Sequence, residues 1–441
     1  MSGTITESGN GAESAVLELH KKFLDTNRPS PELLPLNKKA LDRFERLKFP
    51  HRKHEMYTFV NTKDLADTLF SLKTESSAQQ NFIEQHVYAG CERSHLTFVD
   101  GVLRPELSDA TALGTTVRVA SLADAIKDDS VKNLLEESIE QENDVFASIN
   151  SAFMNQGIMI RVGRDKQIEA PLQILNVSTG GESGPTMTIP RAYIHLERSS
   201  ELKLIVKYIG DSNNYFVNSV QDMFVEENAT LTHIQVQADS TDAWHFSKNR
   251  VYLKRDSRYL GYQATNGARL VRHHNEIWLS EPGAEMELSG VSVLENDEQS
   301  HQFIRVHHEV ENCTSHQHFK NIINDRARAS FDGTVVVNKG AQLTNSDQLI
   351  NNLMLSDEGH ADCKPNLMIF ADDVKCAHGA TVGQLEEEQL FYLQTRGLSE
   401  SVSREILTQS FARSVIQDIP FVPVVEELNQ TLLKKLEANN G

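Results

Sequence analysis

The sequence predicts a mainly β protein whose central body is flanked by helical segments at both ends. Two changes of pattern along the 441 residues carry this prediction. Apolar residues recur at helical spacing near both ends of the chain, whereas short β-forming runs alternate with turn-like pieces in the middle. Hydrophobic residues make up 39% of the chain, which suits a folded protein of two or three domains. We therefore predict three parts, covering residues 1–157, 158–380 and 381–441.

The first part is predicted to be mainly helical. Apolar residues share one helical face in two stretches, residues 62–73 and 121–138. The residues on these faces are Leu65, Leu69 and Leu72 in the first stretch and Leu122, Ile126, Leu134 and Leu135 in the second. Prolines divide the segment before residue 51 into short pieces. Residues 95–107 are the exception, because an Asp-Gly pair at 100 and 101 between apolar runs predicts a β-hairpin.

The central part reads as a series of short strands separated by similar turns. Runs such as "ELKLIVKYIG", "ATLTHIQVQA" and "RASFDGTVVV" are rich in β-formers, and "EENA", "TNGA", "EPGA" and "NKGA" lie between such runs. No helix-length amphipathic segment interrupts them, which argues against βαβ units and for an all-β body. The small residue that recurs just before a strand favours the coils of a right-handed parallel β-helix. A β-sandwich explains the same periodicity, so both folds stay open at this point.

Helical spacing returns after Gly383. Gly397 is placed to end one helix, and Ser399 can cap the start of the next. That second helix would carry Val402, Ile406, Phe411 and Val415. Prolines at 420 and 423 then separate a last helix with Val425, Leu428, Leu432 and Leu436.

Charge and hydropathy limit the classes of function. The formal net charge is −19, so the chain has no overall basic surface that would bind a nucleic acid or an anionic membrane. No apolar stretch approaches the roughly 18 residues that span a bilayer, and the first residues lack the pattern of a secretory signal. We therefore expect a cytoplasmic protein without nucleic-acid or membrane partners.

The stretch "DDVKCAHGATVG" is the clearest candidate for chemistry. On a strand, Cys376 and His378 would share one face and could meet one metal ion or one partner ligand. Two ligands do not complete a metal site, and a buried thiol beside a histidine that bonds the backbone explains the same pattern. The four cysteines form no C-x-x-C pair, so a metal site completed within this chain is not indicated.

Further histidines occur close together in the central part. They are His273 and His274, His307 and His308, and His316 and His318. Adjacent histidines on a strand point to opposite faces, so each of the first two pairs offers at most one ligand to a given site. We expect these side chains to be solvated or to face a partner.

Four stretches resemble the SufB/SufD family of iron-sulfur cluster assembly proteins, and its SufD branch most closely. They are "LTFVDGVLRPELS", "TNSDQLINNLMLS", "IFADDVKCAHGATVG" and "EEEQLFYLQTRGL". The likeness extends over nearly the whole chain and is most specific over residues 344–398. It implies a right-handed parallel β-helix between N-terminal and C-terminal helical domains. It also implies a scaffold subunit without enzymatic activity of its own.

The resemblance further implies partners and site residues. A SufB subunit would pair through the β-helix, and a SufC ATPase would bind the C-terminal helical domain, with a homodimer allowed when the chain is isolated. A nascent iron-sulfur cluster would be held transiently at the SufB interface, with His378 as the family's functional histidine and Cys376 beside it. Asn345 and Cys363 depart from the residues usual in the family.

Within the C-terminal helical domain, the segment "LFYLQTRG" presents residue types that are enriched at interface centres. We expect Phe391, Tyr392, Arg396 and Gly397 to contribute to partner binding. The other interpretation is that these aromatic residues only cap the open end of the β-helix.

Two other functions stay open on the sequence. A β-helix enzyme that acts on carbohydrates would need charged groups clustered on one face, and the chain is long enough to hold them. A purely structural subunit would make no contact with metal. We expect no catalytic residues and no stably bound cofactor in the isolated chain.

Overall fold

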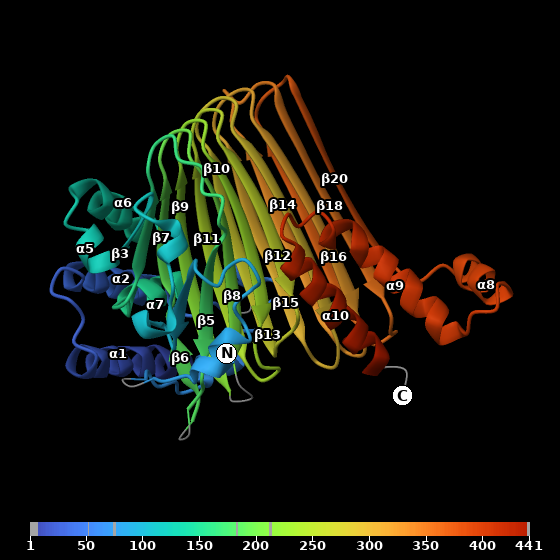
Figure 1. The fold of residues 1–441 in the computed structure, drawn as a ribbon, viewed down its shortest axis with the longest axis horizontal. Coiled ribbons are helices and arrows are strands. Elements are labelled where there is room, and N and C mark those ends of the chain that lie inside the picture. Colours follow the sequence, from blue (N-terminus) through green and yellow to red (C-terminus); the bar gives the residue numbers. More distant parts are fainter. Residues whose placement is uncertain (1–7, 52, 74–75, 182–183, 211–213, 439–441) are drawn as a thin grey trace, which may run out of the picture.

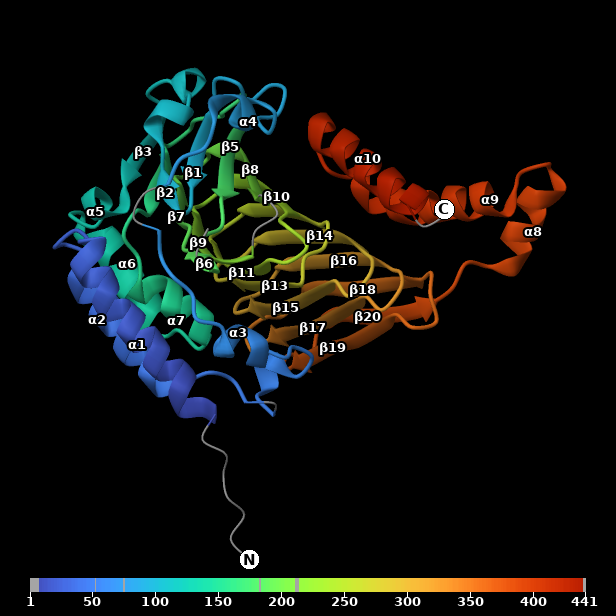
Figure 2. The same cartoon turned by 90° about the horizontal axis from the view of Figure 1, so that it is seen from below.

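The protein is built around a β-solenoid with helices at both of its ends in sequence (Figures 1 and 2). The structure is a computed structural model that describes residues 8–51, 53–73, 76–181, 184–210 and 214–438. Successive strands alternate between two sheets, and nearly all pairs within each sheet are parallel and in register. This topology confirms the β-helix and excludes the β-sandwich, whose sheets are antiparallel.

Two long sheets form the walls of the solenoid, and we call them sheet B and sheet A. In spatial order, the strands of sheet B are β2 (Val102–Leu103), β1 (His95–Val99), β5 (Leu172–Ser178), β8 (Glu201–Gly210), β10 (Thr230–Ala238), β12 (Arg258–Thr265), β14 (Glu285–Leu294), β16 (Thr314–Ile323), β18 (Thr344–Met354) and β20 (Val374–Gly383). Those of sheet A are β19 (His360–Ile369), β17 (Arg328–Val337), β15 (Gln299–His308), β13 (Leu270–Leu279), β11 (Trp244–Leu253), β9 (Tyr215–Val225), β7 (Arg191–Leu196), β4 (Ile158–Val162) and β3 (Val117–Ser121), with β6 (Thr186–Thr188) beside β9.

The corners of the coils explain the turn pattern of the sequence. Asn228 and Asn312 adopt the left-handed conformation, with φ of 57° and 59°. Among residues with a side chain, asparagine and aspartate tolerate this conformation best. Each is followed by a small residue, Ala229 or Cys313, that is 0% exposed because it turns into the interior. A short polar residue followed by a small one therefore closes a corner and starts the next strand.

The interior of the solenoid holds both apolar and polar side chains. Alternate residues of each strand face inward, and residues paired in register share a face. Most inward positions form the main apolar core, but polar inward residues also occur. His273, for example, is 0% exposed, and its ring lies 2.7 Å from Ser247 Oγ and 3.0 Å from Thr265 Oγ1. These hydrogen bonds offset the cost of burying the ring.

Most helices of the first part pack against the outer face of sheet A, whereas α4 packs against sheet B, where Ile83 meets Leu175 and Ile209 (Figure 2). The α-helices are α1 (Ser8–Thr26), α2 (Leu34–Leu47), α3 (Lys63–Asp67), α4 (Gln80–Glu84), α5 (Leu122–Ala125), α6 (Asp129–Glu140) and α7 (Val145–Ala152). Single 3₁₀ turns occur at Glu55–Tyr57, Pro105–Leu107 and Thr111–Leu113.

One predicted helix in this part is wrong in its extent. The helix with Leu65 ends at Asp67, and Leu69 is 75% exposed instead of sharing its buried face. The chain turns extended at Thr68, and Ser71 then pairs with Thr186 beside sheet A. A tertiary strand pairing therefore overrides the local helical spacing. The predicted hairpin is confirmed, because β1 and β2 are antiparallel and Asp100 and Gly101 both have positive φ.

The last part contains α8 (Glu387–Thr395), α9 (Glu400–Ile416) and α10 (Val422–Ala438). Gly397 has φ of 93° after α8, and Ser399 Oγ accepts the Val402 N–H at 3.3 Å, as the sequence predicts. Helices α9 and α10 lie on the outer face of sheet B, where residues such as Val415 and Leu432 pack on strand residues. None of the helices in the described residues is both long enough and apolar enough to cross a membrane.

Three lysines of sheet B form hydrogen bonds or ion pairs with α9, α10 and the segment between them. Lys320 Nζ lies 2.8 Å from the Phe411 carbonyl oxygen, and Lys203 Nζ lies 2.7 Å from that of Pro420. Lys207 forms an ion pair with Glu427 at 2.8 Å. Helices α9 and α10 are therefore fixed to the solenoid, whereas α8 projects away from it in both views (Figures 1 and 2).

Candidate functional site

Strand β20 forms the last rung of sheet B, and it carries Cys376 and His378 on its inner face. The strand pairs with β18 alone, and Cys376 and His378 stand in register with Ser346 and Gln348. Ser346 and Gln348 are 2% and 1% exposed because they face the interior. The two candidate residues therefore point into the end of the solenoid, where no further coil covers them.

Polar side chains continue inward from this site. Ser346 Oγ lies 2.8 Å from Ser315 Oγ, which lies 2.8 Å from His308 Nε2. Cys376 thus follows two hydroxyl side chains on successive rungs. Burial lowers the pKa of His308 to about 4, so its ring is neutral at neutral pH. The polar side chains behind Cys376, which are His308, Ser315 and Ser346, are therefore uncharged.

Cys376 and Cys363 lie on the two terminal strands, and both pack against the main core. Burial raises the pKa of each thiol, so both are protonated at neutral pH unless a metal replaces the proton. Asn352 Nδ2 lies 3.2 Å from Cys363 Sγ and 3.0 Å from the Thr381 carbonyl oxygen. This amide joins the two sheets across the last coil.

Apolar side chains around the open end are exposed to solvent. They are Leu349, Met368, Ile369, Phe370 and Val382. Phe370 is 59% exposed and Val382 is 56% exposed. We call these five residues the end patch. Two unpaired strand edges beside an apolar patch are typical of a surface that another chain covers.

The remaining clustered histidines do not form a metal site. Among the residues that the structure describes, no group of three or more His, Cys, Asp or Glu side chains could hold a metal ion. The expectation of solvated or partner-facing rings is wrong for His273, His274 and His308, which are at most 1% exposed. It failed because strand alternation does not tell solvent from a polar interior, as at His273 and His308, or from a face covered by the N-terminal helices, as at His274. His316 and His318 lie half-buried on the outer face, beside Asp347 and Asn351.

Helix α8 and the two residues that follow it hold the positions predicted to bind a partner. No residue of α8 is buried, and Phe391 and Tyr392 are 68% and 57% exposed. The Arg396 guanidinium lies 5.2 Å from the centre of the Tyr392 ring. The interpretation that these aromatic residues cap the end of the β-helix is therefore wrong, because both rings are exposed and α8 packs beside α9, away from that end (Figure 2).

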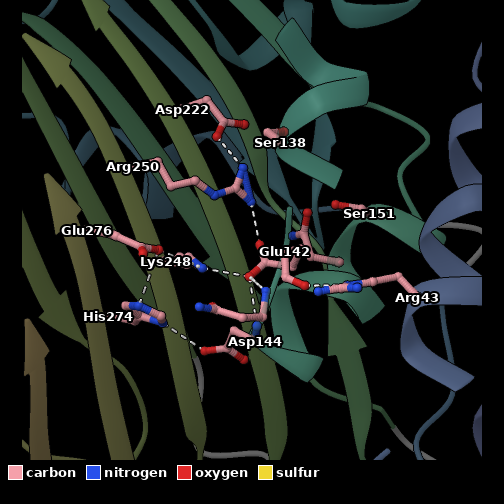
Figure 3. Close-up of polar contacts among 12 residues, drawn as sticks. Arg43, Ser138, Glu142, Asp144, Ser151, Asp222, Lys248, Arg250, His274 and Glu276 are labelled. Carbon is pink, nitrogen blue, oxygen red and sulfur yellow. Dashed lines mark hydrogen bonds and ion pairs between the residues drawn. The ribbon is translucent and has the colours of Figure 1, made fainter. Parts of the chain in front are cut away.

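A buried ionic cluster joins the N-terminal helices to sheet A (Figure 3). Between α6 and α7, Glu142 accepts Lys248 Nζ at 2.6 Å and an Arg250 nitrogen at 2.7 Å. Asp144 accepts an Arg272 nitrogen at 2.8 Å and His274 Nδ1 at 2.9 Å. Burial by itself raises the pKa of Asp144, but Arg272 and His274 hold it well below its usual range. These charges are paired beneath the helices and do not line an open cleft.

Sequence patterns had singled out Cys376 and His378, and the structure brings both to one open end. They had not singled out Gln348, Ser346 or Asn352 behind them, although the segment 344–356 was part of the resemblance. The available signal was the alternation along "TNSDQLINN", which places serine, glutamine and asparagine on the inward face. Polar residues at inward positions of a late coil mark an interior that approaches a site.

Comparisons with known proteins agree with this architecture. Residues 177–411 match the family model "SUF system FeS cluster assembly, SufBD core domain", and residues 17–174 match "SufBD protein N-terminal region". An iron-sulfur cluster assembly SufBD family protein of Synechocystis is 30% identical over 404 residues, 89% of this chain and 88% of that protein.

Two further relatives cover similar shares. The Escherichia coli iron-sulfur cluster assembly protein SufD is 28% identical over 387 residues, 87% of this chain and 88% of that protein. The chloroplastic protein ABCI7 of Arabidopsis thaliana is 28% identical over 425 residues, 92% of this chain and 87% of that protein. Both the core and the N-terminal region match along the chain. The protein therefore belongs to the SufBD family of iron-sulfur cluster assembly proteins and is SufD-like.

Proposed function

We propose that this chain is a non-enzymatic scaffold subunit of a cytoplasmic SufB–SufC–SufD complex, in which it contributes Cys376 and His378 to the site of a nascent iron-sulfur cluster. The observation that carries the proposal is the open last coil, which presents both side chains beside uncovered strand edges. The family assignment supplies the cargo, since the relatives are named as iron-sulfur cluster assembly proteins.

The end patch supports a partner at this site. The five exposed apolar side chains of the end patch lie on the last strands, β18, β19 and β20, or directly after β19, close in the fold to the thiol and the imidazole. A homologous SufB subunit could cover the edges of β19 and β20 and bury the patch, and it would supply the missing ligands. Two ligands from each side would suit iron, which accepts both thiolate and imidazole donors. An isolated chain could cover the same surface with a second copy of itself.

The chemistry of the two residues differs. His378 can bind iron through a neutral ring nitrogen, so it is the proposed ligand. Cys376 is less exposed, and burial raises the pKa of its thiol, so metal must displace a proton before it binds. We therefore expect replacement of His378 to have the larger effect.

The test compares variants of the complex purified with SufB and SufC. His378→Ala should lose bound iron and sulfide while the complex stays assembled, and Cys376→Ser should lose less. His360→Ala is the matched control, because His360 is also exposed, on the other terminal strand, and its side chain is 62% accessible. Normal cluster content in His378→Ala would remove the ligand role and leave a purely structural subunit.

The partner surface is tested separately. Replacing both Met368 and Phe370 by serine removes two exposed apolar side chains without touching the core. This variant should weaken association with SufB and keep the chain folded. If sedimentation shows unchanged association with SufB, the end patch is not the interface.

Helix α8 is the proposed docking site for SufC. Its aromatic residues are exposed, and only residues 384–386 separate it from β20. Because α9 and α10 are fixed to sheet B, a movement of bound SufC would reach the site through α8. A Tyr392→Ala, Arg396→Ala double variant should lower SufC binding and stimulated ATPase activity, and Arg326→Ala at an exposed corner is the control. Unchanged SufC affinity in the double variant would contradict this docking site.

Truncation after Gly383 is a poorer test of the same idea. It would remove α9 and α10 and uncover the apolar outer face of sheet B, including Ile234, Val291 and Ile322. Loss of SufC binding could then follow from misfolding. Substitutions in α8 and at Arg396 directly after it avoid this, since no residue of that helix is buried and Arg396 is exposed.

The alternative of a carbohydrate-active β-helix enzyme receives less support. Such an enzyme needs charged groups that reach a substrate, whereas the ionic cluster of Glu142 and Asp144 is buried and paired beside α6 and α7 (Figure 3). The family assignment also points to assembly and not to turnover.

A further inference from the structure

His378 ends a column of side chains on the inner face of sheet B. The register places Leu288 of β14 beside Gln317 of β16, Gln317 beside Gln348 of β18, and Gln348 beside His378 of β20. Two stacked amides therefore lie directly behind the candidate ligand. In parallel sheets neighbouring strands are about 4.8 Å apart, so a glutamine side chain is long enough to bond a ring on the next rung, although the structure does not show Gln348 in this bond.

Of the two polar atoms of the Gln348 side-chain amide, the nitrogen is hydrogen-bonded and the oxygen is not. Its Nε2 donates to Gln317 Oε1 at 3.3 Å. Its Oε1 is buried and has no hydrogen-bond partner in the described part of the chain. The residue is 1% exposed, so solvent does not reach it. Gly333 leaves room for this arrangement, because a Cβ there would lie 2.8 Å from Gln348 Nε2.

An unbonded buried carbonyl oxygen is unfavourable. Leaving such an acceptor without a donor costs about 1 to 3 kcal/mol, so native structures rarely keep one without a reason. The next rung offers a donor, since the hydrogen bonds among the described residues do not use the His378 ring and a neutral imidazole carries one N–H. The acceptor and the donor stand on adjoining strands in exact register.

We propose that Gln348 is a positioning residue for His378. Its Oε1 accepts the ring N–H, which fixes the tautomer and the plane of the imidazole and directs the other ring nitrogen toward the open end. Gln317 holds the amide of Gln348 in the required orientation. This inference rests on the proposed role of His378 as a ligand, and it adds the group that orients it.

The arrangement has a physical purpose in metal binding. A histidine ligand donates its second N–H to an acceptor, which keeps the ligating nitrogen unprotonated. When a partner covers the end patch, water is excluded and the acceptor must come from protein. Gln348 supplies that acceptor as a neutral group, without burying another charge next to the site.

The test begins with the isolated chain and needs no metal. Nitrogen-15 NMR of labelled histidine reports the tautomer of His378, whose signals are assigned by their loss in His378→Ala. In the native chain, His378 should show one protonated and one unprotonated ring nitrogen. Gln348→Met keeps the length of the side chain and removes the acceptor, so the two signals should move toward each other as both tautomers become populated. Gln302→Met is the matched control, since Gln302 is another buried glutamine with an unbonded Oε1.

A rescue variant decides the direction of the bond. Gln348→Glu keeps an acceptor oxygen but loses the N–H that Gln317 Oε1 accepts, so it is combined with Gln317→Met, and this pair should restore the single tautomer of His378. Failure of this rescue, or native signals in Gln348→Met, would overturn the proposal.

A second measurement separates this proposal from the function. In the complex with SufB and SufC, Gln348→Met should lower the affinity for added Fe²⁺ by about 10- to 100-fold, as loss of such supporting groups does elsewhere. If His378→Ala binds Fe²⁺ normally while the tautomer shifts appear as expected, the ligand role fails and the Gln348–His378 pair stands. Unchanged Fe²⁺ affinity in Gln348→Met, alongside lost affinity in His378→Ala, would refute the positioning role.

Discussion

Asp144 provides the sharpest test of how the helical first part is attached to the β-solenoid. Its carboxylate is 2% exposed and accepts the Tyr57 hydroxyl at 2.7 Å and an Arg272 nitrogen at 2.8 Å. It also caps α7 by accepting the Phe146 N–H at 2.9 Å. Asp144→Asn keeps the shape and one acceptor oxygen but removes the charge. The substitution therefore isolates the electrostatic part of the attachment.

The magnitude follows from what the substitution leaves behind. Arg272 is 2% exposed, and its only other hydrogen bond among the described residues is a 3.3 Å contact to the Met56 carbonyl oxygen. Removing one partner of a buried ion pair costs about 3 to 5 kcal/mol, because the other charge stays buried without compensation. Since the asparagine can still cap α7, we expect a loss near the lower end of this range.

Urea denaturation, followed by tryptophan fluorescence, measures the loss. Trp244 and Trp278 lie on sheet A, so their fluorescence reports on the sheet to which the N-terminal helices are attached. Asp297→Asn is the matched control, because Asp297 also pairs with an arginine, Arg326, at 2.7 Å but is 71% exposed. Exposed pairs contribute little because solvent and salt screen the two charges, so the control should be nearly neutral.

A double variant tests the stated cause. Arg272→Met removes the stranded charge and keeps an apolar side chain of similar length, so Asp144→Asn combined with Arg272→Met should be less unstable than the sum of the two single variants. Hydrogen exchange should meanwhile quicken in α7 of the Asp144→Asn chain. Equal losses in Asp144→Asn and Asp297→Asn, or strictly additive losses in the double variant, would refute the reasoning.

Two further predictions concern the solenoid. Burial lowers the pKa of His233 and His308 from 6.5 to about 4. As the pH falls, the unfolded chain binds protons at these histidines before the folded chain does, so the free energy of unfolding should hold steady above pH 6.5 and fall between about pH 6.5 and 4. At 1.36 kcal/mol per pKa unit, the loss is roughly 3 kcal/mol per histidine. Urea titrations at pH 7.5 and 5 check this, and equal midpoints would contradict it. Gly290→Ala places a Cβ 2.5 Å from the Phe319 ring and should cost about 1 to 3 kcal/mol, whereas Gly379→Ala, 3.6 Å from Leu349, should be nearly neutral in the same assay.

Local patterns were enough to predict many elements. The strands, the corners with a polar residue before a small one, the Asp100-Gly101 hairpin and the caps at Gly397 and Ser399 all depend on residues close in sequence. Backbone conformation at a turn or a helix end follows from a few side chains, so such features are readable without the fold. Cys376 and His378 were found in the same way, from their spacing and from the family resemblance.

Long-range packing decided the rest. The β-helix and the β-sandwich share one periodicity, and only parallel pairing between strands one coil apart, such as Gln317 with Gln348 31 residues later, separates them. The burial of His273 depended on partners from other strands, and the helix at Leu65 stopped because Ser71 found a strand to pair with. A role for Gln348 could be inferred only from the strand register, which places it beside His378 on the neighbouring strand. Spacing along a chain records which residues share a face, but what covers that face depends on residues far away in the sequence.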